Sequence, residues 1–92
     1  MEMNELRKKI DEVDALLLPL LEERMTISQF IGEYKKSRGI PILNQKREEE
    51  IIDKVKANSK EELKDYTAEI YRQIMRVSRE YQDKILKKED WS

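Results

Sequence analysis

The sequence contains no cysteine and no histidine. Without cysteine there are no disulfides, no thiolate nucleophile and no cysteine metal ligands. Without histidine the chain lacks the most frequent general base and the most common metal ligand. We therefore expect no metal and no cofactor. The remaining functional side chains are those of Arg, Lys, Glu, Gln, Ser and Tyr, which suit the binding of an anionic substrate and the stabilisation of charge.

Glycine and proline are also scarce, at two residues each, whereas charged residues make up 42% of the chain and hydrophobic residues 38%. This composition favours long exposed helices over a sandwich or a barrel, so the predicted fold class is all-α. The 92 residues should form one domain, residues 1–92. A single core of this size contributes only about 3–5 kcal/mol to the free energy of unfolding, and oligomerisation commonly adds the rest, so we expect a homo-oligomer.

The sequence has no long apolar run and no excess of positive charge. Nothing in it approaches the roughly 20 apolar residues of a membrane-spanning helix, and the N-terminus lacks the apolar stretch of a signal peptide. The 19 Lys and Arg residues are balanced by 20 Asp and Glu residues, for a net charge of -1. Such a balance does not favour binding to a polyphosphate backbone. We therefore expect a cytoplasmic protein with neither a membrane nor nucleic acid as its partner.

Apolar periodicity predicts a long, a short and a second long helix. The first covers about residues 3–37, and Gly39 and Pro41 mark its end. Pro19 either bends this helix or divides it in two, and we favour a continuous bent helix because the apolar stripe keeps its phase across the proline.

The two later helices are predicted from capping signals. Asn44 is the expected N-cap of the second helix, which should run to about Ala57. Ser59 and Glu62 match a capping box that would start the third helix, running to about Lys87.

One charged residue, Arg24, lies within the apolar stripe of the first helix. The stripe consists of Leu6, Ile10, Val13, Leu17, Leu20, Arg24, Ile27, Ile31 and Tyr34. A guanidinium in such a stripe faces a desolvation penalty of several kcal/mol unless an anion meets it. The exception indicates a buried anion.

Lys35 and Arg7 are two further candidate cations on this helix. Lys35 lies eleven residues after Arg24 and shares its face, about 16 Å along the axis, so the pair is spaced to hold a small dianion. Alternatively, Lys35 is solvated near the helix end. Arg7 lies about 25 Å before Arg24, so it reaches the same ligand only from a second, antiparallel chain of a two-fold dimer. The alternative is a surface arginine.

Uncharged polar residues interrupt the apolar stripe of the third helix. This stripe is Tyr71, Met75, Ser78, Gln82 and Ile85, in which Ser78 and Gln82 lie four residues apart and should both point inward. They either face a ligand or are satisfied by the backbone or water.

The charged residues Arg47 and Glu48 open the second helix. They belong either to the same site or to an exposed first turn of that helix.

Taken together, these residues resemble the all-helical class of chorismate mutase over essentially the whole chain. The resemblance rests on Leu6–Asp14, on Glu23–Arg24 with Gly32–Lys35, on Ile40–Ile42 with Arg47–Glu48, and on Tyr71–Gln82. It implies an intertwined homodimer of three-helix chains. The implied activity is that of an isomerase converting chorismate to prephenate, a step of aromatic amino acid biosynthesis towards phenylalanine and tyrosine.

The resemblance also implies a role for each polar residue of the site. Arg24 and the partner subunit's Arg7 would bind the two substrate carboxylates, assisted by Ser78. The remaining roles follow in the same way: Lys35 and Gln82 would donate to the ether oxygen of the breaking bond, Glu48 would accept from the ring hydroxyl, and Asn44 and Arg47 would shape that corner.

Two alternative functions remain open at this point. One is a lyase on the same scaffold that releases pyruvate from isochorismate. The other is a non-catalytic helical dimerisation module, which accounts for the stripes and the charge but not for Arg24, Ser78 and Gln82 within the stripes.

Overall fold

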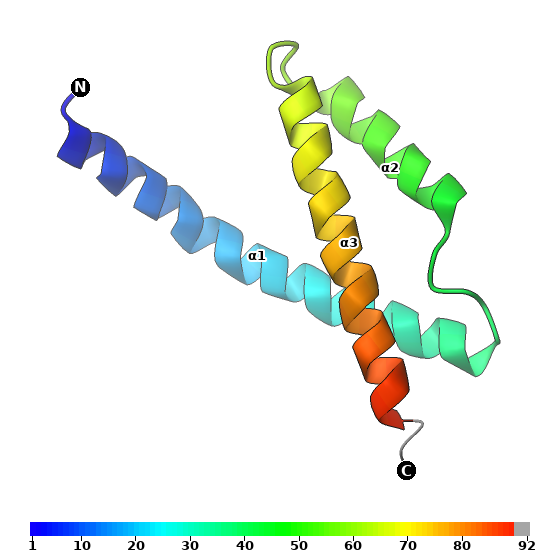
Figure 1. Cartoon of the computed structure of the whole chain (residues 1–92). Coiled ribbons are helices and arrows are strands. Elements are labelled where there is room, and N and C mark those ends of the chain that lie inside the picture. The colour runs from blue at the N-terminus through cyan, green and yellow to red at the C-terminus, as the bar shows by residue number, and fades with distance from the viewer. Residues whose placement is uncertain (90–92) are drawn as a thin grey trace.

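The protein is a three-helix chain in which the third helix packs against the other two. The structure, a computed structural model, describes residues 1–89. The helices are α1 (Met3–Ser37), α2 (Gln45–Asn58) and α3 (Lys64–Glu89), and the described residues contain no strand. Figure 1 shows α3 crossing the C-terminal half of α1, with α2 alongside the first half of α3. The all-α prediction and the long, short, long order are confirmed.

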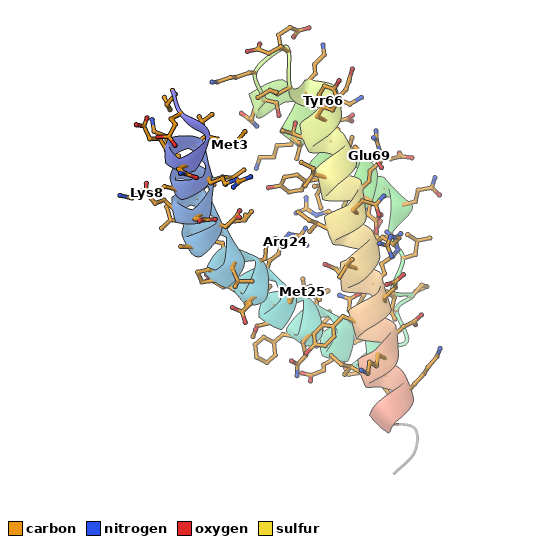
Figure 2. All side chains as sticks on the ribbon, turned by 60° about the vertical axis from the view of Figure 1, so that its left-hand side comes forward. Met3, Lys8, Arg24, Met25, Tyr66 and Glu69 are labelled. Atoms are coloured by element: carbon orange, nitrogen blue, oxygen red, sulfur yellow. The ribbon has the colours of Figure 1, made fainter. Side chains whose placement is uncertain are left out.

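Helix α1 passes through Pro19 without interruption. The continuous form is therefore correct, and Figure 2 shows the helix axis changing direction between Lys8 and Arg24, as expected where a proline removes one backbone hydrogen bond. Residues 1–20 are all exposed. Within residues 1–89, it is the C-terminal half of α1 that packs against the other helices.

A Schellman motif ends α1. Gly39 has φ 65, its N–H donates to the carbonyl of Lys36, and the N–H of Ile40 donates to the carbonyl of Lys35 at 2.8 Å. These bonds satisfy carbonyls that the helix end leaves unpaired. The predicted stop at Gly39 is confirmed, and it turns the chain back towards α2.

Asn44 caps α2 as predicted, because its side chain accepts a hydrogen bond from the backbone N–H of Arg47 at 3.1 Å. The predicted start of α3 is wrong, since the helix begins at Lys64. Ser59 does not act as an N-cap. Its hydroxyl donates to the carbonyl of Val55 at 2.7 Å and contacts the hydroxyl of Thr67, so it closes the end of α2 instead.

Few of residues 1–87 are buried within one chain. They are Ser28, Gly32, Ala68, Met75, Ser78 and Gln82, of which three carry polar side chains. The apolar stripe of α1 remains largely exposed, with Ile10 at 60% and Leu20 at 61%. No helix in the described part of the chain combines the length and apolarity that crossing a bilayer requires.

Gly39→Ala isolates the cost of the turn after α1. A Cβ at Gly39 meets no atom within 4 Å, so the penalty comes from the positive φ alone. We expect the free energy of unfolding to fall by about 1 kcal/mol, since the left-handed conformation costs L-residues about 1–2 kcal/mol. Urea unfolding at fixed protein concentration measures the change. Gly39→Asn should cost less, and equal losses for the two variants would contradict this account.

Candidate active site

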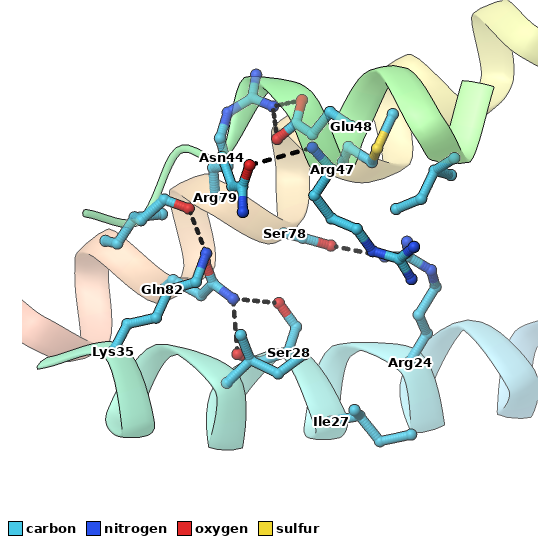
Figure 3. Close-up of a pocket in the computed structure, with 14 residues that line it drawn as sticks. Arg24, Ile27, Ser28, Lys35, Asn44, Arg47, Glu48, Ser78, Arg79 and Gln82 are labelled. Atoms are coloured by element: carbon cyan, nitrogen blue, oxygen red, sulfur yellow. Dashed lines mark hydrogen bonds and ion pairs between the residues drawn. The ribbon is translucent and has the colours of Figure 1, made fainter. Parts of the chain in front are cut away.

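A pocket of about 270 Å³ lies where the C-terminal half of α1, the start of α2 and the C-terminal half of α3 meet. Seven of the eight predicted site residues line it (Figure 3), namely Arg24, Lys35, Asn44, Arg47, Glu48, Ser78 and Gln82. Apolar side chains complete the walls: Ile27, Ile31, Ile42, Ile51 and Met75. The structure thus brings together residues that are distant in sequence, while their roles remain predictions.

The two cations from α1 have neutral partners. Arg24 is half-buried and its Nη1 donates to the Ser78 hydroxyl at 3.2 Å. Lys35 is half-buried and its Nζ donates to the carbonyl of Ile42 at 2.7 Å. Within residues 1–89 no carboxylate pairs with either side chain. A half-buried cation with only neutral partners favours an anionic ligand.

Gln82 is buried at 6% exposure and is held by α1. Its Nε2 donates to the backbone carbonyl of Ser28 at 2.8 Å and to the Ser28 hydroxyl at 3.0 Å, so both amide hydrogens are engaged. A Cβ at Gly32 would lie 3.0 Å from Cγ of Gln82. The glycine therefore provides the space in which the Gln82 side chain lies. Ser28 and Gly32 were not among the predicted site residues.

The start of α2 contributes the polar corner of the pocket. The side-chain oxygen of Asn44 accepts the capping hydrogen bond from the backbone N–H of Arg47. The Arg47 side chain is exposed, and its Nη1 lies 3.8 Å from Oε2 of Glu50. Glu48 forms an ion pair with Arg79 of α3, drawn near the top of Figure 3. Sequence reasoning missed Arg79, because no spacing within α3 indicates which residue of another helix it meets.

The pocket carries a net positive charge. Four cations line it, Arg24, Lys35, Arg47 and Arg79, against the single carboxylate of Glu48, an excess of three positive charges. No three acidic side chains gather to hold a metal ion in the described part of the chain. Cationic groups between apolar walls suit a small organic anion.

A pKa shift in the described part of α3 lies outside the pocket. Hydrogen bonds from Gln73 and Arg72 lower the pKa of the exposed Glu69 carboxyl. This shift belongs to the outer surface of α3 and has no part in the pocket.

Arg7 does not line the pocket of its own chain. It lies on the exposed half of α1, and the continuous helix separates it from Arg24 by about 25 Å along the axis. A single chain therefore does not bring Arg7 to this site.

Comparison with known proteins gives consistent matches. The sequence profile of the family described as chorismate mutase type II matches residues 6–83. A chorismate mutase of Methanocaldococcus jannaschii is 40% identical over 60 residues, which cover 65% of this chain and 61% of that protein. A bifunctional chorismate mutase/prephenate dehydratase of Aquifex aeolicus is 43% identical over 60 residues, covering 65% of this chain and 17% of that protein.

Each of these alignments thus spans less than two thirds of the relative's own length. The fold has a solved counterpart in a conserved hypothetical protein from Pyrococcus furiosus. The TM-score is 0.71 at 36% identity, and the match covers 87% of this chain and 93% of that chain.

Gly32→Ala tests the close approach of α1 and α3. Alanine gains up to about 1 kcal/mol of helix propensity over glycine. The added Cβ, however, would meet both Cγ and Cβ of Gln82, at 3.0 and 3.2 Å, and overpacking costs about 1–3 kcal/mol. We expect a net loss of about 1 kcal/mol in the free energy of unfolding, measured by urea denaturation. The loss should shrink in a Gln82→Ala background, and a net gain from Gly32→Ala would contradict the close contact.

Proposed function

The chain belongs to the chorismate mutase type II family, and on this premise we propose that it converts chorismate to prephenate. The observation that carries the proposal is the pair of half-buried cations, Arg24 and Lys35, which have neutral partners in an apolar-walled pocket. Chorismate is a small dianion with two carboxylates. Its charge and size suit this pocket better than those of a neutral or cationic ligand.

The proposed reaction is a concerted intramolecular rearrangement. One carbon–oxygen ether bond breaks and one carbon–carbon bond forms within the same molecule, so no nucleophile, metal or proton transfer is required. The protein's task is to hold the reacting ends together, and well-oriented intramolecular arrangements remove several kcal/mol from a barrier. Ile27, Ile31 and Met75 supply walls that restrict the substrate's conformation.

Charge stabilisation falls mainly to Lys35. Negative charge grows on the ether oxygen as the bond breaks, and a fixed cation there binds the transition state more tightly than the substrate. An ammonium group has three donors, and Lys35 uses one on the Ile42 carbonyl, which leaves two for the ligand. Gln82 has no spare amide hydrogen, so its donation to the same oxygen requires release of a Ser28 contact, and the 3.0 Å bond to the hydroxyl is the longer of the two.

The active form in this proposal is a homodimer. Two features support it: residues 1–20 are exposed in one chain, and this half of α1 carries large apolar side chains on one face, among them Ile10, Val13 and Leu17. An apolar face of that extent favours association. A second copy packed antiparallel on α1 would bring the partner subunit's Arg7 to the Arg24 pocket, supplying a cation for the second carboxylate.

The other candidate functions have less support. Isochorismate has the same charge, but the curated relatives described above are named for chorismate mutase activity. The relative from Aquifex aeolicus is also named for prephenate dehydratase, an activity that consumes the proposed product. This pairing supports a place in aromatic amino acid biosynthesis. The cytoplasmic location and the absence of a cofactor remain predictions from the sequence.

Arg24→Leu tests the proposed activity. Wild-type protein at micromolar concentration should deplete the ultraviolet absorption of chorismate. Loss of the Arg24 guanidinium should reduce kcat/KM by at least about 100-fold, because the variant loses a charged contact to the dianion. The free energy of unfolding of Arg24→Leu should equal or exceed that of wild type, because the substitution leaves no carboxylate of residues 1–89 unpaired.

Arg72→Leu is the matched control, because Arg72 lies on the exposed surface of α3, and it should retain activity. Inert wild-type protein would refute the mutase proposal. Faster release of pyruvate from isochorismate than conversion of chorismate would favour the lyase.

Subunit mixing tests whether the partner's Arg7 completes the site. Arg7→Ala and Arg24→Leu homodimers should each be nearly inactive. After unfolding and refolding together, half of the dimers are mixed, and each mixed dimer carries one intact site, so about a quarter of wild-type activity should return. No recovery, with exchange verified by differently tagged chains, would show that Arg7 does not act across the interface.

A further inference from the structure

The ion pair between Glu48 and Arg79 is more buried than the ion pairs on the outer surfaces of α2 and α3. Its side chains are 25% and 33% exposed, whereas those of five other ion pairs between described residues are at least 39% exposed, namely Arg47–Glu50, Lys56–Asp65, Lys64–Glu61, Arg72–Glu69 and Arg76–Glu80. It joins α2 to α3, and both residues line the pocket. Because screening by solvent weakens exposed pairs most, this pair contributes more to the free energy of the site than an exposed pair would.

The contact is made by one nitrogen of the guanidinium. Nη1 of Arg79 donates to both carboxylate oxygens of Glu48, with 2.6 Å to Oε2. An ionised carboxylate has about four acceptor positions, so two donated bonds leave it able to accept from a ligand. Arg79 therefore holds Glu48 without exhausting its acceptor capacity.

From this geometry we propose that Arg79 is a positioning residue that acts through Glu48. The inference rests on the proposed function and on the role that the family resemblance implies for Glu48, which is to accept a hydrogen bond from the ring hydroxyl of chorismate. Arg79 fixes the direction of the carboxylate, so that the acceptor is in place before the substrate arrives. An unheld glutamate would have to be ordered during binding, at an entropic cost.

Arg79 also neutralises the one negative charge that lines the pocket. A bare carboxylate beside a dianionic substrate would repel it, and like charges within a few ångströms oppose binding strongly where water is partly excluded. The guanidinium removes this repulsion while the oxygen atoms remain available. Both effects act on the bound substrate and on its transition state alike, so they lower KM and leave kcat nearly unchanged.

The test compares Arg79→Met, Glu48→Gln and the double variant by steady-state kinetics with chorismate. Arg79→Met should raise KM about 10-fold while kcat stays within about 3-fold of wild type. In the Glu48→Gln background no charge needs neutralising, so adding Arg79→Met should change KM by less than about 2-fold. Because a single nitrogen makes the contact, Arg79→Lys should recover most of the loss.

Arg76→Met is the matched control. Arg76 pairs with Glu80 at 2.7 Å on the exposed side of α3, so its loss removes a similar ion pair outside the pocket and should leave KM unchanged. Additive losses in the double variant would overturn the inference, because they would place Arg79 in direct contact with substrate. Arg79→Met that lowers kcat and thermal stability at unchanged KM would overturn it as well, since that pattern marks a purely structural pair.

The two proposals fail in different ways. If wild-type protein does not consume chorismate, the proposed function is refuted, and this inference is refuted with it. If the wild type is active while the losses in KM add, only the role of Arg79 is refuted.

Discussion

The half-buried guanidinium of Arg24, which contacts a hydroxyl and none of the carboxylates of residues 1–89, is the constraint on which the site depends. Partial burial of a cation is costly, and a neutral partner recovers only part of the lost hydration. Lys35 repeats this arrangement at the other end of the pocket with a backbone carbonyl. In the proposed function, two such cations between apolar walls lower the free-energy cost of binding a small dianion.

Helix α3 positions these groups because both other helices pack on it. On its inward stripe, Met75 is a buried wall of the pocket and Ser78 accepts a hydrogen bond from Arg24. Gln82, on the same stripe, donates to Ser28 of α1. The absence of a side chain at Gly32 allows α1 and α3 to approach. Hydrogen-bonded polar groups thus replace much of the apolar core between the helices, and their directionality gives the pocket its defined geometry.

The small amount of buried apolar surface links stability to assembly. Ala68 and Met75 are the only buried apolar residues among those described, while large apolar side chains along α1 remain exposed. In the proposed dimer, association of the two chains buries that surface and also completes each pocket with the partner subunit's Arg7. Folding and activity would then share one dependence on protein concentration.

The sequence by itself determined the features that depend on neighbours within one or two helical turns. These include the bounds of α1, the stop at Gly39, the Asn44 cap and the inward stripe of α3. Only the tertiary structure decided which groups meet between helices, namely Glu48 with Arg79 and Gln82 with Ser28. It also showed that Ser59 contacts Thr67 and closes α2, so α3 begins later than predicted. The physical reason is that periodicity and capping act locally, whereas a contact between helices depends on the angle and register at which they pack.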